Sequence, residues 1–224
     1  MEQTQNTEPS PTVIAINGSP RVGWNTHILV EEALKGAASK GAKTEMFNLY
    51  ELDFKGCISC FECKRKGGSS MGRCAVSDDL RPVLDKIDSC NGLIIGSPIY
   101  LFEVTAAVRA FFERLIFQYL TYRSDGSFLF KGKLKSLFIY TMNVPESALA
   151  QVGYLEKFKA YQTMLTRLGH STYMTSTETL ATNDYDKYEM SMFNGQERAK
   201  RRADIFPLDR KKAFNLGAEL LTIE

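Results

Sequence analysis

The sequence lacks a long hydrophobic run, a strong charge of either sign and a supply of histidine. No apolar stretch approaches the roughly 18–20 residues that a membrane-spanning helix needs, and the polar N-terminus does not resemble a signal peptide. The net charge of +2 does not indicate a nucleic-acid surface or a polybasic membrane patch. The chain has only two histidines, His27 and His170, which stand apart, so we expect them to cap or pack rather than bind metal.

These absences predict a cytoplasmic protein that binds neither nucleic acid nor membrane. We expect residues 1–11 to be a disordered leader and residues 12–224 to form one domain, since 224 residues suffice for one buried core. In a reducing cytosol, clustered cysteines indicate ligation or catalysis more than disulfides.

Short β-rich segments alternate with helical segments along most of the chain. Strands are predicted at residues 12–16, 43–49, 92–96, 134–142 and 171–177, and helices at 25–40, 77–87, 104–117, 148–168 and after Pro207. This order predicts an α/β fold, with a parallel sheet between two layers of helices.

Residues 178–206 show too little apolar periodicity for another sheet unit, so we expect an irregular extension. Its tyrosines could cover a ligand mouth or a partner subunit. Within it, residues 184–188 are expected to form a solvated loop and residues 200–202 a solvated basic face.

The end of the first strand has the residues that a phosphate group needs. Ligands of open parallel sheets bind at the carboxyl ends of the strands. The stretch from Gly18 to Thr26 lacks the patterns of dinucleotide and triphosphate loops. It offers hydroxyls at Ser19 and Thr26, a guanidinium at Arg21 and a helix N-terminus. The alternative is an ordinary strand-to-helix turn capped by Asn25.

Two further strand ends carry weaker signals. Residues 97–102 combine a rigid proline with apolar and aromatic side chains, which suit the wall of a flat ring system but also suit simple packing. Residues 141–143 supply a hydroxyl, backbone amides and a side-chain amide.

Together these stretches resemble the flavodoxin-like NAD(P)H-dependent FMN reductases. The resemblance is carried by the first strand with its Gly-Ser-Pro-Arg loop, and by Gly-Ser-Pro-Ile-Tyr before an Ala-x-x-Arg-Ala-Phe-Phe-Glu-Arg helix. It covers residues 12–117 and fades to topology afterwards. It implies a flavodoxin-like three-layer α/β/α sandwich with five parallel strands in the order 2-1-3-4-5.

The resemblance also implies FMN as cofactor and NAD(P)H as electron donor. The implied phosphate-binding residues are Ser19, Arg21, Asn25 and Thr26. The implied ring-binding residues are Pro98, Ile99, Tyr100, Leu101 and Phe102. Thr141, Met142 and Asn143 form a third loop, which departs from the often glycine-rich loop of the family. A homodimer or higher homo-oligomer is implied as well, and the apolar and aromatic surplus at residues 111–122 could serve its contacts.

Four of the five cysteines, Cys57, Cys60, Cys63 and Cys74, fall in one short segment of the loop 56–76. C-x2-C-x2-C is a spacing that iron–sulfur proteins use, whereas zinc sites more usually show two separated pairs. The run resembles the compact motif of the iron–sulfur flavoprotein branch of the same family. Its gap between Cys63 and Cys74 is longer, which leaves open either a [4Fe–4S] cluster held by the four cysteines or the loss of the cluster.

The remaining cysteine, Cys90, precedes a buried strand and is expected to be an inert core thiol.

The function that the resemblance implies is hydride transfer from NAD(P)H to FMN, followed by electron transfer to a small-molecule or small redox-protein acceptor. The flavin carries this chemistry, so no catalytic acid–base residues are expected. Two alternatives remain open: a non-enzymatic electron carrier of the flavodoxin type, and a cysteine-metal binding module on the same scaffold.

Overall fold

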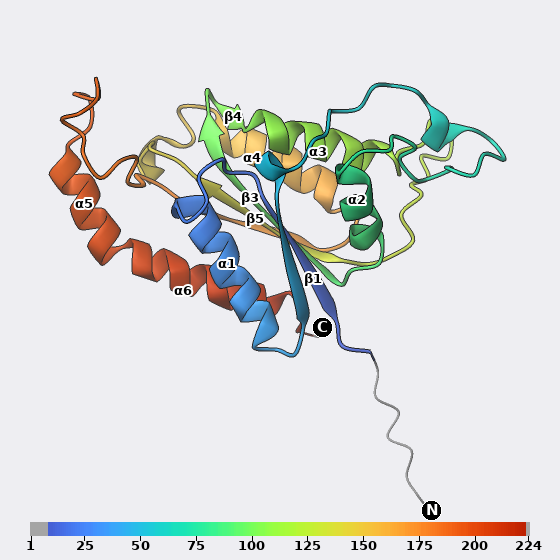
Figure 1. The fold of residues 1–224 in the computed structure, drawn as a ribbon, viewed down its shortest axis with the longest axis horizontal. Helices are drawn as coiled ribbons and strands as arrows, with labels where there is room; N and C mark the ends of the chain where they lie inside the picture. Colours follow the sequence, from blue (N-terminus) through green and yellow to red (C-terminus); the bar gives the residue numbers. More distant parts are fainter. Residues whose placement is uncertain (1–8, 223–224) are drawn as a thin grey trace, which may run out of the picture.

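A parallel sheet lies between two helical layers in the computed structural model, which describes residues 9–222 (Figure 1). The parallel strands are β1 (Thr12–Asn17), β2 (Lys43–Asn48), β3 (Gly92–Tyr100), β5 (Lys135–Thr141) and β6 (Ser171–Ser176). Their order is β2-β1-β3-β5-β6, which confirms the predicted five-stranded order. Most of the predicted leader, residues 1–8, lies outside the described residues.

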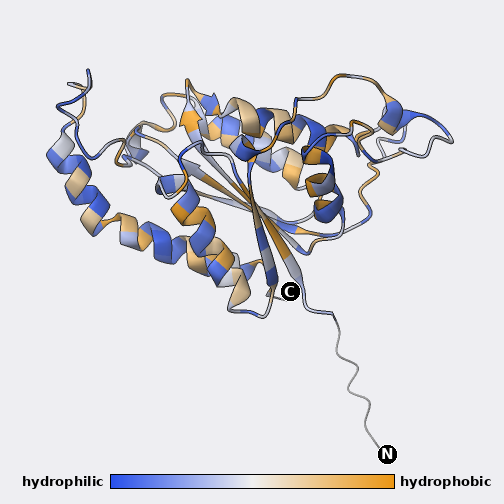
Figure 2. Cartoon of the chain, in the orientation of Figure 1, coloured by the Kyte–Doolittle hydropathy of each residue, from blue (hydrophilic) through white to orange (hydrophobic). Residues whose placement is uncertain are grey.

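The central strands are buried on both faces, as their composition predicts. Val13 to Ile16 of β1 and Leu93 to Ile95 of β3 have at most 1% of their surface exposed. In an all-parallel sheet both faces are covered by helices, so such strands need no polar alternation. Figure 2 shows these strands as the apolar centre of the molecule.

Each face of the sheet carries its own helical layer and its own hydrophobic core. One layer contains α1 (Asn25–Ala38) and α6 (Phe206–Glu219); the other contains α2 (Leu80–Asp88), α3 (Ala106–Phe117) and α4 (Tyr154–Leu165) (Figure 1). The backbones of α1 and α6 touch, because a Cβ on Gly36 would lie 1.9 Å from the Phe214 carbonyl oxygen. The three-layer sandwich is therefore confirmed.

Three short 3-10 helices occupy connections between these elements: Leu49–Glu51, Glu62–Lys64 and Glu146–Ala148. The last of them, with Gly153 in a left-handed conformation (φ 75°), delays the start of α4 to Tyr154. The helix predicted from residue 148 is therefore shorter than expected.

The second and largest difference lies between the last strand and the last helix. Residues 178–206 were expected to be irregular, but Gly195–Asp204 forms the helix α5. The Asn194 side chain caps it by accepting from the backbone N–H groups of Gln196 and Glu197. No residue of α5 is buried, so the helix has no apolar stripe for a sequence pattern to reveal.

A third difference concerns the end of β3. The residues predicted as a turn after Gly96 continue the strand to Tyr100, with Ser97 opposite Tyr140 and Pro98 opposite Thr141 in β5. The two-residue strand β4 (Glu103–Val104) then pairs antiparallel with β3. None of the helices in the described part of the chain is long and apolar enough to cross a membrane.

Candidate functional site

A cleft of about 100 Å³ opens at the carboxyl ends of β1, β3 and β5. Three strand ends that are far apart in the sequence contribute to it, together with the segment 179–181. Ten of the twelve predicted cofactor-binding residues line the cleft: Ser19, Arg21, Asn25, Thr26, Pro98, Ile99, Tyr100, Thr141, Met142 and Asn143. The other two, Leu101 and Phe102, lie outside its lining.

The loop after β1 is held by Asn17, which the sequence analysis did not single out. This buried side chain accepts from the Ser19 N–H at 3.2 Å and donates to the Ser19 carbonyl at 3.3 Å. The Ser19 hydroxyl in turn accepts from the Arg21 N–H at 3.1 Å. Gly18 allows close packing on α3, since a Cβ there would lie 1.9 Å from Val108 Cγ2.

Hydroxyl groups connect the three strand ends to one another. Thr26 Oγ1 and Thr141 Oγ1 are 2.8 Å apart and both residues are buried. Thr105, the N-cap of α3, donates from its hydroxyl to the Gly18 carbonyl at 2.8 Å. These hydrogen bonds join the ends of β1 and β5 to the starts of α1 and α3 on this side of the cleft.

The two guanidinium groups at the cleft donate hydrogen bonds to neutral acceptors. Arg21 Nη1 donates to the Ala181 carbonyl at 2.7 Å, and Asn25 Nδ2 donates to the Leu180 carbonyl at 2.9 Å. Arg202 Nη1, from α5, donates to Asn25 Oδ1 at 2.6 Å. Within residues 9–222, no carboxylate forms a salt bridge with Arg21 or Arg202. The site therefore suits an anion.

The same geometry corrects one expectation about residues 178–206. Arg202 is not on a solvated face: its partial burial, and then the charges of Arg210 and Arg201, lower its pKa. Arg201 likewise pairs with Asp209 at 2.7 Å, and only Lys200 of that run is exposed. The loop 184–188 is mostly exposed, as expected. Within it the half-buried Tyr185 accepts through its hydroxyl from the Ala181 N–H at 2.9 Å.

The turn between β3 and β4 has an unusual backbone. Leu101 and Phe102 have φ angles of 48° and 67°, a region that bulky residues rarely occupy. Leu101 is 94% exposed and Phe102 58% exposed. Strain of this kind concentrates at functional sites, and this turn is the second half of the predicted ring-binding stretch.

The four clustered cysteines surround one small cavity beside α3. Cys63 is buried, Cys57 and Cys74 are half-buried, and Cys60 is exposed. Ser59 and Phe61, between the first three cysteines, have left-handed φ angles of 53° and 60°. Burial raises the pKa of Cys63. Across the described residues, no three Cys, His, Asp or Glu side chains are close enough together to hold a metal ion.

The long gap before Cys74 is a closed loop. The Gly72 N–H donates to the Cys63 carbonyl at 3.0 Å, so the chain leaves and returns at nearly the same point. Cys74 then lies two residues beyond this closure. The extra residues therefore do not separate Cys74 from the cavity that the other three cysteines line.

Two side chains of α3 and its C-cap also face this cavity. Arg114 donates from its Nε to Cys74 Sγ at 3.2 Å and forms a salt bridge with Asp78 at 2.6 Å. Gln118 accepts from the Cys74 N–H at 3.0 Å through its Oε1. Its Nε2 is buried and has no hydrogen-bond partner among the described residues.

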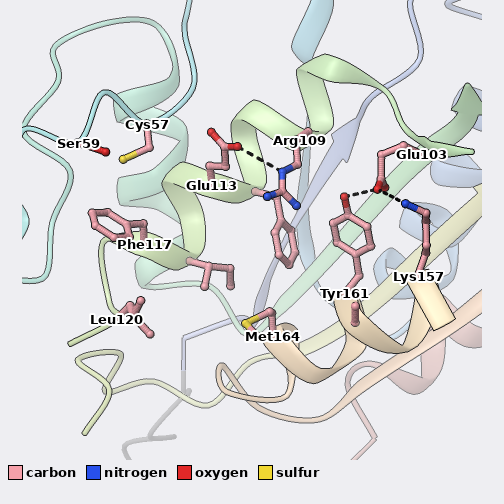
Figure 3. A pocket seen from close by; sticks show the side chains of 13 residues that line it. Cys57, Ser59, Glu103, Arg109, Glu113, Phe117, Leu120, Lys157, Tyr161 and Met164 are labelled. Carbon is pink, nitrogen blue, oxygen red and sulfur yellow. Dashed lines mark hydrogen bonds and ion pairs between the residues drawn. The ribbon is translucent and has the colours of Figure 1, made fainter. Parts of the chain in front are cut away.

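A larger groove of about 660 Å³ runs between α3 and α4 and was not predicted (Figure 3). Cys57 lies at one end, and at the other Glu103 accepts from the Tyr161 hydroxyl at 2.9 Å and from Lys157 at 3.0 Å. Burial raises the pKa of Tyr161 to about 12. The groove lies between the strained turn after β3 and the cysteine segment.

Cys90 and the two histidines lie outside the cleft and both cavities. Burial raises the pKa of Cys90 to about 12, as expected for an inert core thiol. His27 has a buried Nδ1 without a partner among residues 9–222, and His170 accepts from the Ser136 N–H only through its backbone carbonyl. Neither histidine side chain lines the cleft, the cysteine cavity or the groove.

The parallel sandwich with a cationic cleft at its strand ends has the architecture of a flavodoxin-like protein. The sequence profile of the NADPH-dependent FMN reductases matches residues 11–170, and the chain belongs to that family. An iron-sulfur flavoprotein of Methanocaldococcus jannaschii is 38% identical over 102 residues, which are 46% of this chain and 50% of that protein.

An iron-sulfur flavoprotein of Clostridioides difficile is 30% identical over 116 residues, 50% of this chain and 49% of that protein. Both relatives are iron–sulfur flavoproteins, the branch that the cysteine motif of this chain resembles. The chain spans about half the length of the curated relatives it matches.

Solved structures share the fold over nearly the whole chain. A NAD(P)H:quinone oxidoreductase from Methanothermobacter marburgensis has a TM-score of 0.71 at 15% identity, covering 95% of this chain and 100% of that one. An azoreductase from Bacillus anthracis has a TM-score of 0.62 at 14% identity, covering 93% and 99%. At such identities the likeness concerns the fold alone.

Proposed function

We propose that this protein is a cytoplasmic FMN-dependent oxidoreductase that takes hydride from NAD(P)H and passes electrons to a small-molecule or small redox-protein acceptor. The observation that carries the proposal is the cleft, in which ten predicted cofactor residues meet. One of them, Arg21, and the neighbouring Arg202 have no carboxylate partner within residues 9–222. FMN, when bound, supplies the hydride and electron chemistry, and the protein binds and orients it.

The donors of the first loop fit a phosphate group. Ser19, Arg21, Asn25 and Thr26 surround the start of α1, where the helix dipole favours an anion. In the present structure Asn25 and Arg21 donate their hydrogen bonds to the Leu180 and Ala181 carbonyls instead of to a ligand. The cleft is also smaller than the roughly 300–1,000 Å³ of common ligand pockets. FMN binding therefore requires the segment 179–181 to move.

The ring side of the cleft also fits a flavin. Pro98, Ile99 and Tyr100 line it, and we propose that Leu101 and Phe102 of the adjoining turn extend this wall. Asn143 Oδ1 is buried and lacks a partner among the described residues. A ring N–H is a donor that this acceptor needs, so the third loop supports a flavin despite its departure from the glycine-rich pattern.

We further propose that Cys57, Cys60, Cys63 and Cys74 hold a [4Fe–4S] cluster. Four thiols line one cavity that no carboxylate lines, and this soft donor set suits iron–sulfur chemistry. The thiols must approach one another on loading. If no cluster forms, the same segment remains a set of free thiols beside a flavin enzyme.

A homodimer or higher homo-oligomer completes the proposal. The apolar and aromatic residues at positions 111–122 do not supply a broad contact surface, since Phe111, Phe112 and Tyr119 are buried in the core. Tyr122 is 72% exposed and Phe61 49% exposed, and their stacked rings lie 6.4 Å apart. We propose this aromatic pair as part of the contact, and light scattering of the purified protein measures the oligomeric state.

The first experiment is the visible spectrum of protein purified without oxygen, followed by FMN titration and assays of NADH and NADPH oxidation with a quinone. Flavin bands and steady turnover support the reductase. Bound flavin without nicotinamide oxidation favours the electron carrier. Colourless protein that contains zinc and takes up no FMN favours the cysteine-metal module and overturns the proposal.

A further inference from the structure

We infer that Arg114 and Gln118 are the N–H donors that set the reduction potential of the four-cysteine centre. The two residues are four positions apart at the end of α3, so they lie on the same side of the helix. Both are almost completely buried, at 2% and 3% exposure. The inference rests on the proposed cluster and assigns these two residues a role toward it.

Arg114 is fixed in place by acceptors other than the cysteines. Its two terminal nitrogens donate to the two oxygens of Asp78, at 2.6 and 3.0 Å, and to the carbonyls of Lys55 and Val76, at 3.1 and 3.4 Å. These contacts leave the Nε–H, which points at Cys74 Sγ at 3.2 Å. The carboxylate partner and the sulfur are thus bound by different N–H groups of one guanidinium.

Gln118 has a donor without an acceptor. Its Oε1 accepts from the Cys74 N–H at 3.0 Å, which fixes the orientation of the amide, since an N–H group can donate only to the oxygen. The amide NH₂ is left buried and without a partner among the described residues, beside a cavity lined by all four cysteines. An unsatisfied buried donor destabilises the fold, and a sulfur acceptor that carries negative charge would remove that penalty.

The charged groups beside the cavity already have partners. Lys64 donates to the carbonyls of Phe117 and Gln118 at the C-terminus of α3. Asp78, the carboxylate nearest to Arg114, is already paired with it. The sulfurs therefore face donors from α3 and no unpaired acid in the lining.

Donors to sulfur stabilise the reduced form of a cluster more than the oxidised form, because the reduced form carries one more negative charge. Hydrogen bonds to the sulfurs and the residues behind the ligands are known determinants of cluster potential. In this couple the cluster gains one electron, supplied in the test by dithionite, and no atom is transferred. Removing a donor therefore shifts the potential to a more negative value.

Two variants remove the donors while keeping charge or volume. Arg114→Lys keeps the positive charge but loses the Nε–H, and Gln118→Met keeps an uncharged chain of similar length without N–H groups. Arg123→Lys and Gln151→Met are matched controls at exposed positions. All four proteins are compared with the unaltered protein after anaerobic reconstitution with iron and sulfide.

The measurement is a redox titration followed by electron paramagnetic resonance of the reduced cluster, with iron, sulfide and FMN contents determined in parallel. We expect each donor variant to lower the equilibrium constant for reduction by about tenfold, a shift of 59 mV for a one-electron couple, and the controls to leave it unchanged. The two variants alter different side chains. If one of them does not fold, the other still tests the donor role.

The outcomes distinguish a failure of the donor role from a failure of the proposed cluster. Unaltered protein that holds no iron after reconstitution overturns the cluster and the donor role together, while FMN binding is scored separately. A cluster whose potential is the same in both donor variants and in the unaltered protein overturns the donor role alone.

Discussion

Arg202 Nη1 lies 2.6 Å from Asn25 Oδ1, so a guanidinium near the C-terminus contacts the loop after the first strand, 177 positions away. Arg202 also stacks on the Phe206 ring at 3.9 Å. Among residues 9–222 its partner at the cleft is a neutral amide, and burial with neighbouring charges lowers its pKa. The helix α5 thus brings an uncompensated cation to the proposed phosphate site.

Arg202→Ala is expected to weaken FMN binding by about 10- to 150-fold, because a hydrogen bond or ion pair to a charged group contributes roughly 1.5–3 kcal/mol. Lys200→Ala, on the same helix but exposed, is the control and should bind FMN normally. Quenching of flavin fluorescence in a titration gives both dissociation constants. Equal constants would show that α5 does not contribute to the phosphate site.

The segment that closes the cleft is held by Tyr185, whose hydroxyl accepts from the Ala181 N–H at 2.9 Å. Tyr185→Phe removes that hydrogen bond and should speed FMN association about fivefold, since a hydrogen bond of this kind contributes about 1 kcal/mol. Tyr188→Phe, at a half-exposed neighbour, is the control. Stopped-flow mixing measures the association rates, and an unchanged rate in Tyr185→Phe would mean that the segment does not limit entry.

The Cys90 thiol should make the fold sensitive to alkali. Burial raises its pKa from 9.0 to about 12, so the folded state keeps a proton that the unfolded chain releases. Stability from this group is complete below about pH 9 and declines as the pH rises toward 12. At pH 10, one unit above the unfolded value, the loss is about 1.4 kcal/mol.

Urea unfolding of the FMN-free protein, in the presence of reductant, measures this loss. The free energy of unfolding should fall about 1.4 kcal/mol more between pH 8 and pH 10 in the unaltered protein than in Cys90→Ala. Ser89→Ala, at the exposed preceding position, should behave like the unaltered protein. Parallel pH profiles for all three proteins would exclude a titrating Cys90.

The sheet and most of the cleft could be predicted from the sequence because both depend on local patterns of apolar and turn residues. Buried runs such as Val13–Ile16 mark the central strands, and their carboxyl ends meet at one edge whatever the loops contain. The residues of the first loop and of β3 therefore come together as the strand order requires. The family resemblance added the identity of the ligand, which no spacing supplies.

The part of the site that could not be predicted consists of side chains in segments without a recognisable hydrophobic pattern. Arg202 lies on a helix without a buried residue, and Tyr185 on a polar loop. Their contacts depend on where the chain returns after β6, a tertiary property. Asn17 ends the first strand, but nothing in the sequence shows that its side chain is buried and holds Ser19.

The closed loop before Cys74 supports a last prediction about the cysteine cavity. Because the Gly72 N–H bonds to the Cys63 carbonyl at 3.0 Å, the residues between them form an excursion that begins and ends beside the cavity. Replacing Lys66–Ser70 by two glycines should therefore leave the iron content of anaerobically reconstituted protein unchanged.

Cys74→Ser should lower the iron content to a small fraction, because a hydroxyl is a poor substitute for a thiolate on iron. Cys90→Ser, outside the cavity, should leave it unchanged. Iron per chain is measured for the three variants beside the unaltered protein. If the protein with the shortened loop contains no iron while Cys74→Ser keeps its iron, then the residues between Cys63 and Gly72 bind the iron and Cys74 is not a ligand.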